Sequence, residues 1–216
     1  MNERIAFDRE TISNYAHLIG VDEAGRGPLA GPVAVGAVKI SRNFLQRMDE
    51  FPFLSEVNDS KKLSPKKREV LFKYFFELRR QKLLQFTLSL RDHKIIDKIN
   101  ILEATTRAMN DAIGRLSGPH AKILVDGKFV KNLRFDHCAI PKGDGKSFCI
   151  AAASIIAKVI RDRLMNYFSK KYSQYGFERH KGYGTAMHID ALKCHGPSPI
   201  HRLTFCKHFF TSPSEA

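Results

Sequence analysis

The sequence is poor in cysteine and contains no pattern typical of a zinc site or a disulfide framework. Its four cysteines are scattered along the chain without a CxxC pair: Cys138, Cys149, Cys194 and Cys206. This spacing provides neither a zinc knuckle nor paired cross-links. We therefore expect isolated thiols in a reducing compartment.

Long apolar runs are also missing. The uncharged stretch over residues 147–157 is far shorter than the roughly 20 residues that a membrane-spanning helix needs. The first 18 residues are charged and lack the apolar core of a signal peptide. These absences predict a cytoplasmic protein.

Acidic residues are few compared with basic ones. Lys and Arg number 36 against 22 Asp and Glu, which gives a formal charge of +14 and a pI near 9.8. Such a surplus is typical of proteins that bind phosphate-rich partners, and a basic surface kept for solubility is the alternative. With 216 residues, of which 43% are hydrophobic, the chain suits one globular domain with a small C-terminal extension.

The apolar pattern predicts an α/β fold with three layers around a mixed sheet. Strands are expected at residues 18–22, 33–40, 83–90, 122–126 and 135–140. Helices are expected from Ser64 onward and over residues 92–116, 147–172 and 185–194. The segment between the first two strands is rich in glycine and proline, so we expect a sharp loop there.

Acidic residues at strand ends are the most informative feature. Asp22 and Glu23 end the first strand, Asp126 ends the strand at 122–126, and Asp144 lies in a glycine-flanked turn before the long helix. Functional groups gather at strand ends in α/β folds, and four carboxylates there would repel one another unless a divalent cation neutralised them. Oxygen ligands favour Mg²⁺ or Mn²⁺.

Two considerations oppose this interpretation of the acids. Aspartate is common at turns for local reasons, so each acid alone is equally consistent with turn chemistry. Neighbouring strand residues also point to opposite faces of a sheet. Asp22 and Glu23 can therefore share a metal only if the chain twists at Glu23.

Several other segments are candidates for nucleic-acid contacts. Glycines around Arg26 would let backbone N–H groups approach a ligand, and lysines at a helix start are well placed for phosphates. A lysine on an apolar helix face either reaches the surface or faces a charged ligand, and a tyrosine between glycines can stack on a sugar or base. The candidate residues are Gly25, Arg26, Gly27, Ser60, Lys61, Lys62, Ser154, Lys158 and Tyr183. A tight turn, a solvated basic face and a core tyrosine are the alternatives.

Six segments together resemble the ribonuclease HII family. They are GVDEAGRGPLAGPV, NDSKKLSPKKRE, LVDGK, PKGDGKS, AAASIIAKVIRDR and HKGYGT, and they follow one another between residues 20 and about 185. The later segment HGPSPIHR resembles the C-terminal part of bacterial members. Matches this long and collinear are far more specific than a single glycine motif.

The resemblance implies a ribonuclease H-like fold over residues 1–180 and a C-terminal extension, residues 181–216, that contributes to substrate binding. It implies that Asp22, Glu23, Asp126 and Asp144 hold two Mn²⁺ or Mg²⁺ ions. It also implies that the GRG loop recognises a ribose 2′-OH, the group that distinguishes RNA from DNA, and that Tyr183 stacks on the following deoxyribose.

The function implied by the resemblance is two-metal hydrolysis of the RNA strand in RNA–DNA hybrids, with incision 5′ of single ribonucleotides in duplex DNA. The products would carry a 3′-hydroxyl and a 5′-phosphate. The resemblance further suggests a monomer, and the aromatic tail HFFTSPSEA is a candidate contact for a replication clamp. A non-catalytic basic protein that binds nucleic acid is the alternative from another class.

Overall fold

A five-stranded mixed sheet lies at the centre of the molecule. The structure is a computed structural model that describes residues 2–128 and 130–209. The strands are β1 (His17–Ala24), β2 (Val33–Ser41), β3 (Leu84–Arg91), β4 (Ala121–Asp126) and β5 (Cys138–Ile140). Their order in the sheet is β3-β2-β1-β4-β5, where β1 pairs antiparallel with β2 and parallel with β4.

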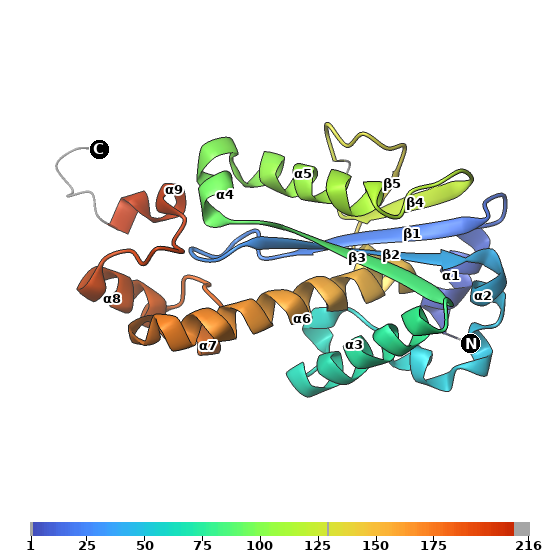
Figure 1. The fold of residues 1–216 in the computed structure, drawn as a ribbon, viewed down its shortest axis with the longest axis horizontal. Helices are drawn as coiled ribbons and strands as arrows, with labels where there is room; N and C mark the ends of the chain where they lie inside the picture. The colour runs from blue at the N-terminus through green and yellow to red at the C-terminus, as the bar shows by residue number, and fades with distance from the viewer. Residues whose placement is uncertain (1, 129, 210–216) are drawn as a thin grey trace.

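Helices cover both faces of this sheet, which confirms the expected three-layer α/β fold (Figure 1). On one face lie α4 (His93–Ile99) and α5 (Ile101–Gly114), and on the other lie α3 (Pro65–Arg80) and α6 (Phe148–Lys171). The remaining helices are α1 (Glu3–Thr11), α2 (Arg42–Gln46), α7 (Phe177–His180), α8 (Ala186–His195) and α9 (Leu203–Cys206). No described helix is both long enough and apolar enough to span a membrane.

Two glycines let α6 lie directly against the sheet. A Cβ atom on Gly20 of β1 would overlap the backbone of Cys149, and one on Gly36 of β2 would overlap the carbonyl of Ala153. Because interiors are close-packed, such overlaps cannot be absorbed without moving the helix. The helix start, and the acid-bearing turn just before it, are therefore fixed against β1.

Local sequence signals account for most of the helix boundaries. The Ser64 hydroxyl accepts from the Lys67 N–H at the start of α3, and the Ser147 hydroxyl accepts from the Ile150 N–H at the start of α6. The expectation of one helix over 92–116 is wrong. Asn100 adopts φ 64° and its side chain accepts from the Glu103 N–H, so α4 ends there and α5 begins.

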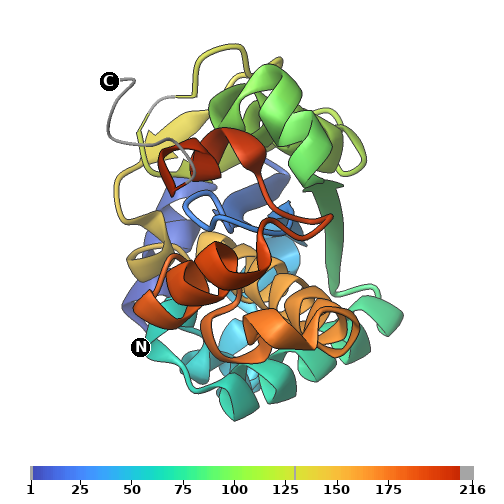
Figure 2. The ribbon, with the colours of Figure 1, turned by 90° about the vertical axis from the view of Figure 1, so that its left-hand side faces the viewer.

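The C-terminal helices gather at one end of the sheet, opposite the end that carries α1 and α2 (Figure 1). Seen from that end, α7, α8 and α9 lie in front of the sheet and surround the loop that joins β1 to β2 (Figure 2). They have a small core of their own, which includes Phe177, Leu192 and Cys206 and also takes in Leu29 of that loop. The candidate clamp-binding tail spans residues 208–216, and residues 210–216 of it lie outside the described part of the chain.

Candidate active site

Three aspartates from separate parts of the chain meet at one edge of the sheet. Asp22 is on β1, Asp126 ends the neighbouring parallel strand β4, and Asp144 is in the turn before α6. One carboxylate oxygen of each lies within 4.8 Å of the other two. The Asp126 carboxylate also accepts a 2.6 Å hydrogen bond from the Gly143 N–H, which ties β4 to that turn.

Glu23 lies beside this group of three aspartates, and its side chain points to the face of β1 opposite that of Asp22. β1 stays regular through Glu23, which pairs with Val35 of β2, so successive side chains point to opposite faces. The Glu23 carboxylate forms a 3.3 Å ion pair with Arg26. Glu23 and Asp126 nevertheless line the same pocket, together with Thr105 and Thr106 of α5.

Burial and mutual repulsion make the negative charges of this cluster costly. The pKa of Asp22 lies well above its ordinary value, mainly because the carboxyl is buried and then because Glu23 and Asp126 are close. Burial, followed by Asp126, also raises the pKa of Asp144. Burial raises the pKa of Glu23, against the opposing influence of Arg26. A carboxylate cluster of this kind is stabilised by a divalent cation.

The donor set of the cluster fits a hard divalent cation. Every donor atom of the three aspartates is a carboxylate oxygen, and these are the ligands that Mg²⁺ and Mn²⁺ prefer. Asp22 and Asp144 are 4% and 6% exposed, so their oxygens face the cluster more than bulk water. Nearby, the Lys61 ammonium lies 3.5 Å from Asp144 on an otherwise exposed side chain.

The glycine loop, which consists of Gly25, Arg26 and Gly27, lies beside Tyr183. A Cβ on Gly27 would stand 3.9 Å from a ring carbon of Tyr183. Arg26 and Gly27 are exposed while Gly25 is buried. Tyr183 is 44% exposed, so its ring is open to solvent as a stacking surface would be. The Arg26–Glu23 ion pair links this surface to the acidic cluster.

The basic segment before α3 is divided between surface and interior. Lys61 and Lys62 are exposed, whereas Ser60 is buried and its backbone carbonyl accepts a 2.7 Å hydrogen bond from Arg68. Arg68 also donates to the Leu63 carbonyl, at 2.6 Å. Arg68 therefore holds the segment in place, and the two lysines are the groups that a ligand can reach.

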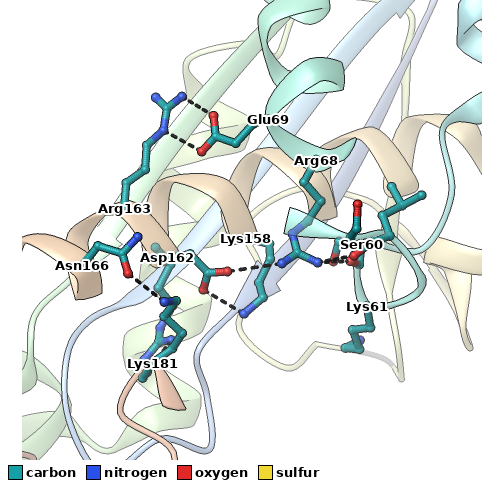
Figure 3. A network of polar contacts seen from close by, with 12 residues as sticks. Ser60, Lys61, Arg68, Glu69, Lys158, Asp162, Arg163, Asn166 and Lys181 are labelled. Atoms are coloured by element: carbon teal, nitrogen blue, oxygen red, sulfur yellow. Dashed lines mark hydrogen bonds and ion pairs between the residues drawn. The ribbon is translucent and has the colours of Figure 1, made fainter. Parts of the chain in front are cut away.

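A polar network extends from this segment along α6 (Figure 3). Asp162 pairs with Lys158 at 2.8 Å and with Arg68 at 3.6 Å. Lys181 lies next to them and donates to Asn166 at 2.7 Å. These cations line one pocket between α3, α6 and α7, and Asp162 serves there as an ion-pair partner.

Ser154 does not reach this surface. Its side chain is buried, and its hydroxyl donates to the Ala151 carbonyl at 2.8 Å. Lys158, one turn further along α6, is partly exposed and lines the pocket. The structure thus separates two residues that the sequence placed together on one helix face.

Comparison with known proteins identifies the family. The family model described as Ribonuclease HII matches residues 19–208. The chain belongs to the ribonuclease HII family. Curated relatives named Ribonuclease HII include one from Ruminiclostridium cellulolyticum, 45% identical over 97% of this chain and 78% of the relative, and one from Acholeplasma laidlawii, 47% identical over 94% of each.

Solved structures of related enzymes have the same fold. The ribonuclease H2 of Pyrococcus horikoshii OT3 is 29% identical, with a TM-score of 0.70 over 91% of this chain and 100% of that one. The ribonuclease HII in a PCNA complex from Archaeoglobus fulgidus is 26% identical, with a TM-score of 0.68 over 90% and 97%. Membership of the ribonuclease HII family makes the chain a metal-binding ribonuclease H, a hydrolase that acts on RNA–DNA hybrids.

Sequence reasoning missed several residues around this ribonuclease HII site. Arg161 and Arg202 are almost completely buried beneath the glycine loop, and Arg68 anchors the basic segment. A charged residue within an apolar helix was a usable signal for Arg161. Arg202 ends the segment HGPSPIHR, but the carbonyls that its guanidinium holds lie more than 170 positions away along the chain.

Proposed function

We propose that this ribonuclease H incises DNA duplexes on the 5′ side of a single embedded ribonucleotide, as well as the RNA strand of hybrids. The observation that supports the proposal most strongly is the placement of three clustered aspartates, the glycine loop and Tyr183 along one connected surface. The acids provide a place for metal-assisted hydrolysis, and the loop and tyrosine provide a place to read one ribonucleotide.

Asp22, Asp126 and Asp144 would hold the cations, with Glu23 as a fourth ligand from the side of Arg26. Two divalent cations at such a site supply activation of water for in-line attack and stabilisation of the departing 3′ oxygen. The products would carry a 3′-hydroxyl and a 5′-phosphate. Lys61 lies close enough to Asp144 to offset part of the negative charge and to contact a nearby phosphate.

Gly25, Arg26 and Gly27 would recognise the ribose 2′-OH, and Tyr183 would stack on the next deoxyribose. Exposure of Arg26, Gly27 and Tyr183 supports these roles, since a ligand can reach all three. A ribonucleotide followed by a deoxyribonucleotide would satisfy both contacts at once. We leave Ser154 out of the substrate contacts because it is buried, and we take Ser60 to contribute through its backbone.

The basic pocket beside α6 would bind the nucleic-acid backbone. Lys61 and Lys62 at the segment before α3 and Lys158 at the pocket provide positive charge, in a chain of formal charge +14. Phosphate contacts of this kind position a duplex without reading its sequence. Residues 181–216 would act as the substrate-binding extension of a catalytic domain formed by residues 1–180. A sliding clamp is the proposed protein partner, on the strength of the related enzyme that was solved with PCNA.

The test is cleavage of a DNA duplex that contains one ribonucleotide, with Mg²⁺ or Mn²⁺ and then with EDTA. We expect a metal-dependent nick 5′ of the ribonucleotide and no cut in the matching all-DNA duplex. Asp144→Asn should abolish the nick and retain duplex binding. Asp136→Asn removes an exposed acid outside the cluster and serves as the matched control.

Two results would contradict the proposal. One is cleavage of an RNA–DNA hybrid without any nick at the single ribonucleotide, which would mean that the loop and Tyr183 do not read a junction. The other is unchanged turnover in Asp144→Asn, which would mean that the aspartate cluster is not the metal site.

A further inference from the structure

Two arginines are buried directly beneath the glycine loop. Arg202, which lies just before α9, is 0% exposed. Its guanidinium donates to three backbone carbonyls: Gly31 at 2.9 Å, Arg26 at 2.8 Å and Gly25 at 2.6 Å. A planar guanidinium can hold three acceptors in one fixed arrangement. One side chain from the end of the chain thus fixes both ends of the β1–β2 loop.

Arg161 of α6 holds the rest of this loop and connects it to the tyrosine. It is 1% exposed and donates to the carbonyls of Pro32 at 2.9 Å and Ala30 at 3.2 Å. Its third hydrogen bond, at 3.0 Å, goes to the carbonyl of Lys181, two residues before Tyr183. The Arg161 guanidinium also lies 5.8 Å from the centre of the Tyr183 ring.

Burying the charges of Arg161 and Arg202 costs the fold free energy. Within the described residues, neither guanidinium forms an ion pair with a carboxylate, and all six acceptors are backbone carbonyls. Burial lowers the pKa of Arg161, and burial followed by the nearby Arg161 lowers the pKa of Arg202 to about 9. Apolar side chains fill such space at lower cost than buried charges. Packing alone therefore does not explain two charged residues here.

The direction of the held carbonyls has a consequence for the loop surface. The C=O and N–H groups of a trans peptide point in opposite directions. Because Arg202 draws the carbonyls of Gly25 and Arg26 inward, the N–H groups of Arg26 and Gly27 point outward. Both residues are exposed. Gly25 has φ 93°, and a Cβ atom there would overlap the Arg161 side chain, so the loop has this shape only with glycine at that position.

We propose that Arg161 and Arg202 are positioning residues that fix the glycine loop and Tyr183 relative to each other before a substrate binds. This inference rests on the proposed reading of a ribonucleotide junction. A duplex with one ribonucleotide offers a single register in which its 2′-OH meets the loop while the next deoxyribose meets Tyr183. A continuous hybrid offers a 2′-OH at every position of the RNA strand, so it tolerates a shift of the loop. The two arginines therefore determine selectivity for the junction.

The test compares kcat/KM for a single-ribonucleotide duplex with kcat/KM for a continuous hybrid, in wild type and in Arg202→Lys and Arg161→Lys. A lysine keeps the charge, but its donors share one nitrogen atom and cannot reproduce the planar fork that holds three separate carbonyls. We expect the ratio of kcat/KM for the single-ribonucleotide duplex to kcat/KM for the hybrid to fall on the order of tenfold to a hundredfold in each variant. The fall should come from a lower kcat for the single-ribonucleotide duplex, because a small misplacement of binding groups has an effect of this size. KM for the duplex should change little, since phosphate contacts supply most of its affinity.

Two controls separate positioning from general loss of stability. Leu54→Ala weakens the core cluster that holds Ile5 of α1 and Phe44 of α2 and none of loop residues 25–32, so it should lower Tm while leaving the ratio unchanged. Arg42→Lys is the matched arginine control. Arg42 also donates to backbone carbonyls, those of Ile12 and Ser13, outside the glycine loop, so this variant should leave the ratio unchanged. An unchanged ratio in folded Arg202→Lys would overturn the inference. Wild type without junction cleavage would instead overturn the proposed function.

Amide hydrogen exchange of the free wild-type protein tests the same idea without a variant. The Leu29 and Gly31 N–H groups donate to the carbonyls of Gly182 and Ile200, at 2.8 and 2.9 Å. If the loop is fixed in advance, these amides should exchange slowly before any substrate is added. Exchange at the rate of an unstructured peptide would overturn the inference, whether or not the lysine variants fold.

Discussion

Removing one carboxylate from the aspartate cluster should stabilise the metal-free protein and weaken its response to metal. The change is Asp144→Asn, which keeps the size of the side chain and removes its charge. Two unit charges 4.8 Å apart, the largest separation in the cluster, repel by about 3.5 kcal/mol at an effective dielectric constant of 20. Protonation relieves part of this repulsion, because burial and the nearby Asp126 raise the pKa of Asp144.

The opposing contribution is small. Asp144→Asn also removes the 3.5 Å ion pair with Lys61, whose side chain is 77% exposed. An exposed pair of this kind contributes roughly 1 kcal/mol or less. The expected net gain is therefore about 2 kcal/mol, which corresponds to a rise in Tm of roughly 4–8 °C for a chain of this length.

Thermal unfolding in EDTA and in Mn²⁺ measures both effects. In EDTA the variant should unfold at a higher temperature than wild type. Mn²⁺ at about 100 times its Kd should stabilise wild type by about 2.7 kcal/mol and should stabilise the variant much less. Asp136→Asn, which removes an exposed acid outside the cluster, should behave as wild type does. A lower Tm in EDTA, or an undiminished response to Mn²⁺, would refute the reasoning.

Three further predictions concern single side chains. Tyr183→Ala should slow cutting at a single ribonucleotide by about tenfold to a hundredfold, the value of one stacking contact, whereas replacing Tyr167, an exposed aromatic on α6, should not. Asp162→Asn leaves Lys158 and Arg68 without their carboxylate, so the duplex should bind more tightly. The slope of the logarithm of the binding constant against the logarithm of the salt concentration should steepen by about one unit, which filter binding at several salt concentrations measures. Burial raises the pKa of Asp8 to about 7, so wild type should lose stability relative to Asp8→Asn as pH rises from about 4 to 8, and a constant difference in unfolding free energy would contradict this.

The sequence by itself determined the elements and the chemistry that they carry. Strands and helices follow from apolar periodicity, and the starts of α3 and α6 follow from the cap residues Ser64 and Ser147. These signals act over a few residues, so they can be read without knowing the fold. The positions of the candidate acids and of the glycine loop were readable for the same reason. The break at Asn100 was missed because apolar spacing continues across it.

The tertiary structure decided which of these residues meet. Parallel pairing of β1 with β4 places Asp22 beside Asp126, and the close approach of α6 to Gly20 fixes the turn that carries Asp144. Regular pleating turns Glu23 toward Arg26, on the opposite face of β1 from Asp22. Such relations depend on strand order and helix packing, which short segments do not encode.

The same limit applies to the buried arginines. Nothing near Arg202 in the sequence indicates that its guanidinium holds the carbonyls of Gly25 and Arg26, some 177 and 176 positions earlier. Ser154 and Lys158 share one helix face by spacing, yet packing against the sheet buries the first and leaves the second at the pocket. Local propensity determines what each segment is, and long-range packing determines which side chains are exposed and which atoms they contact.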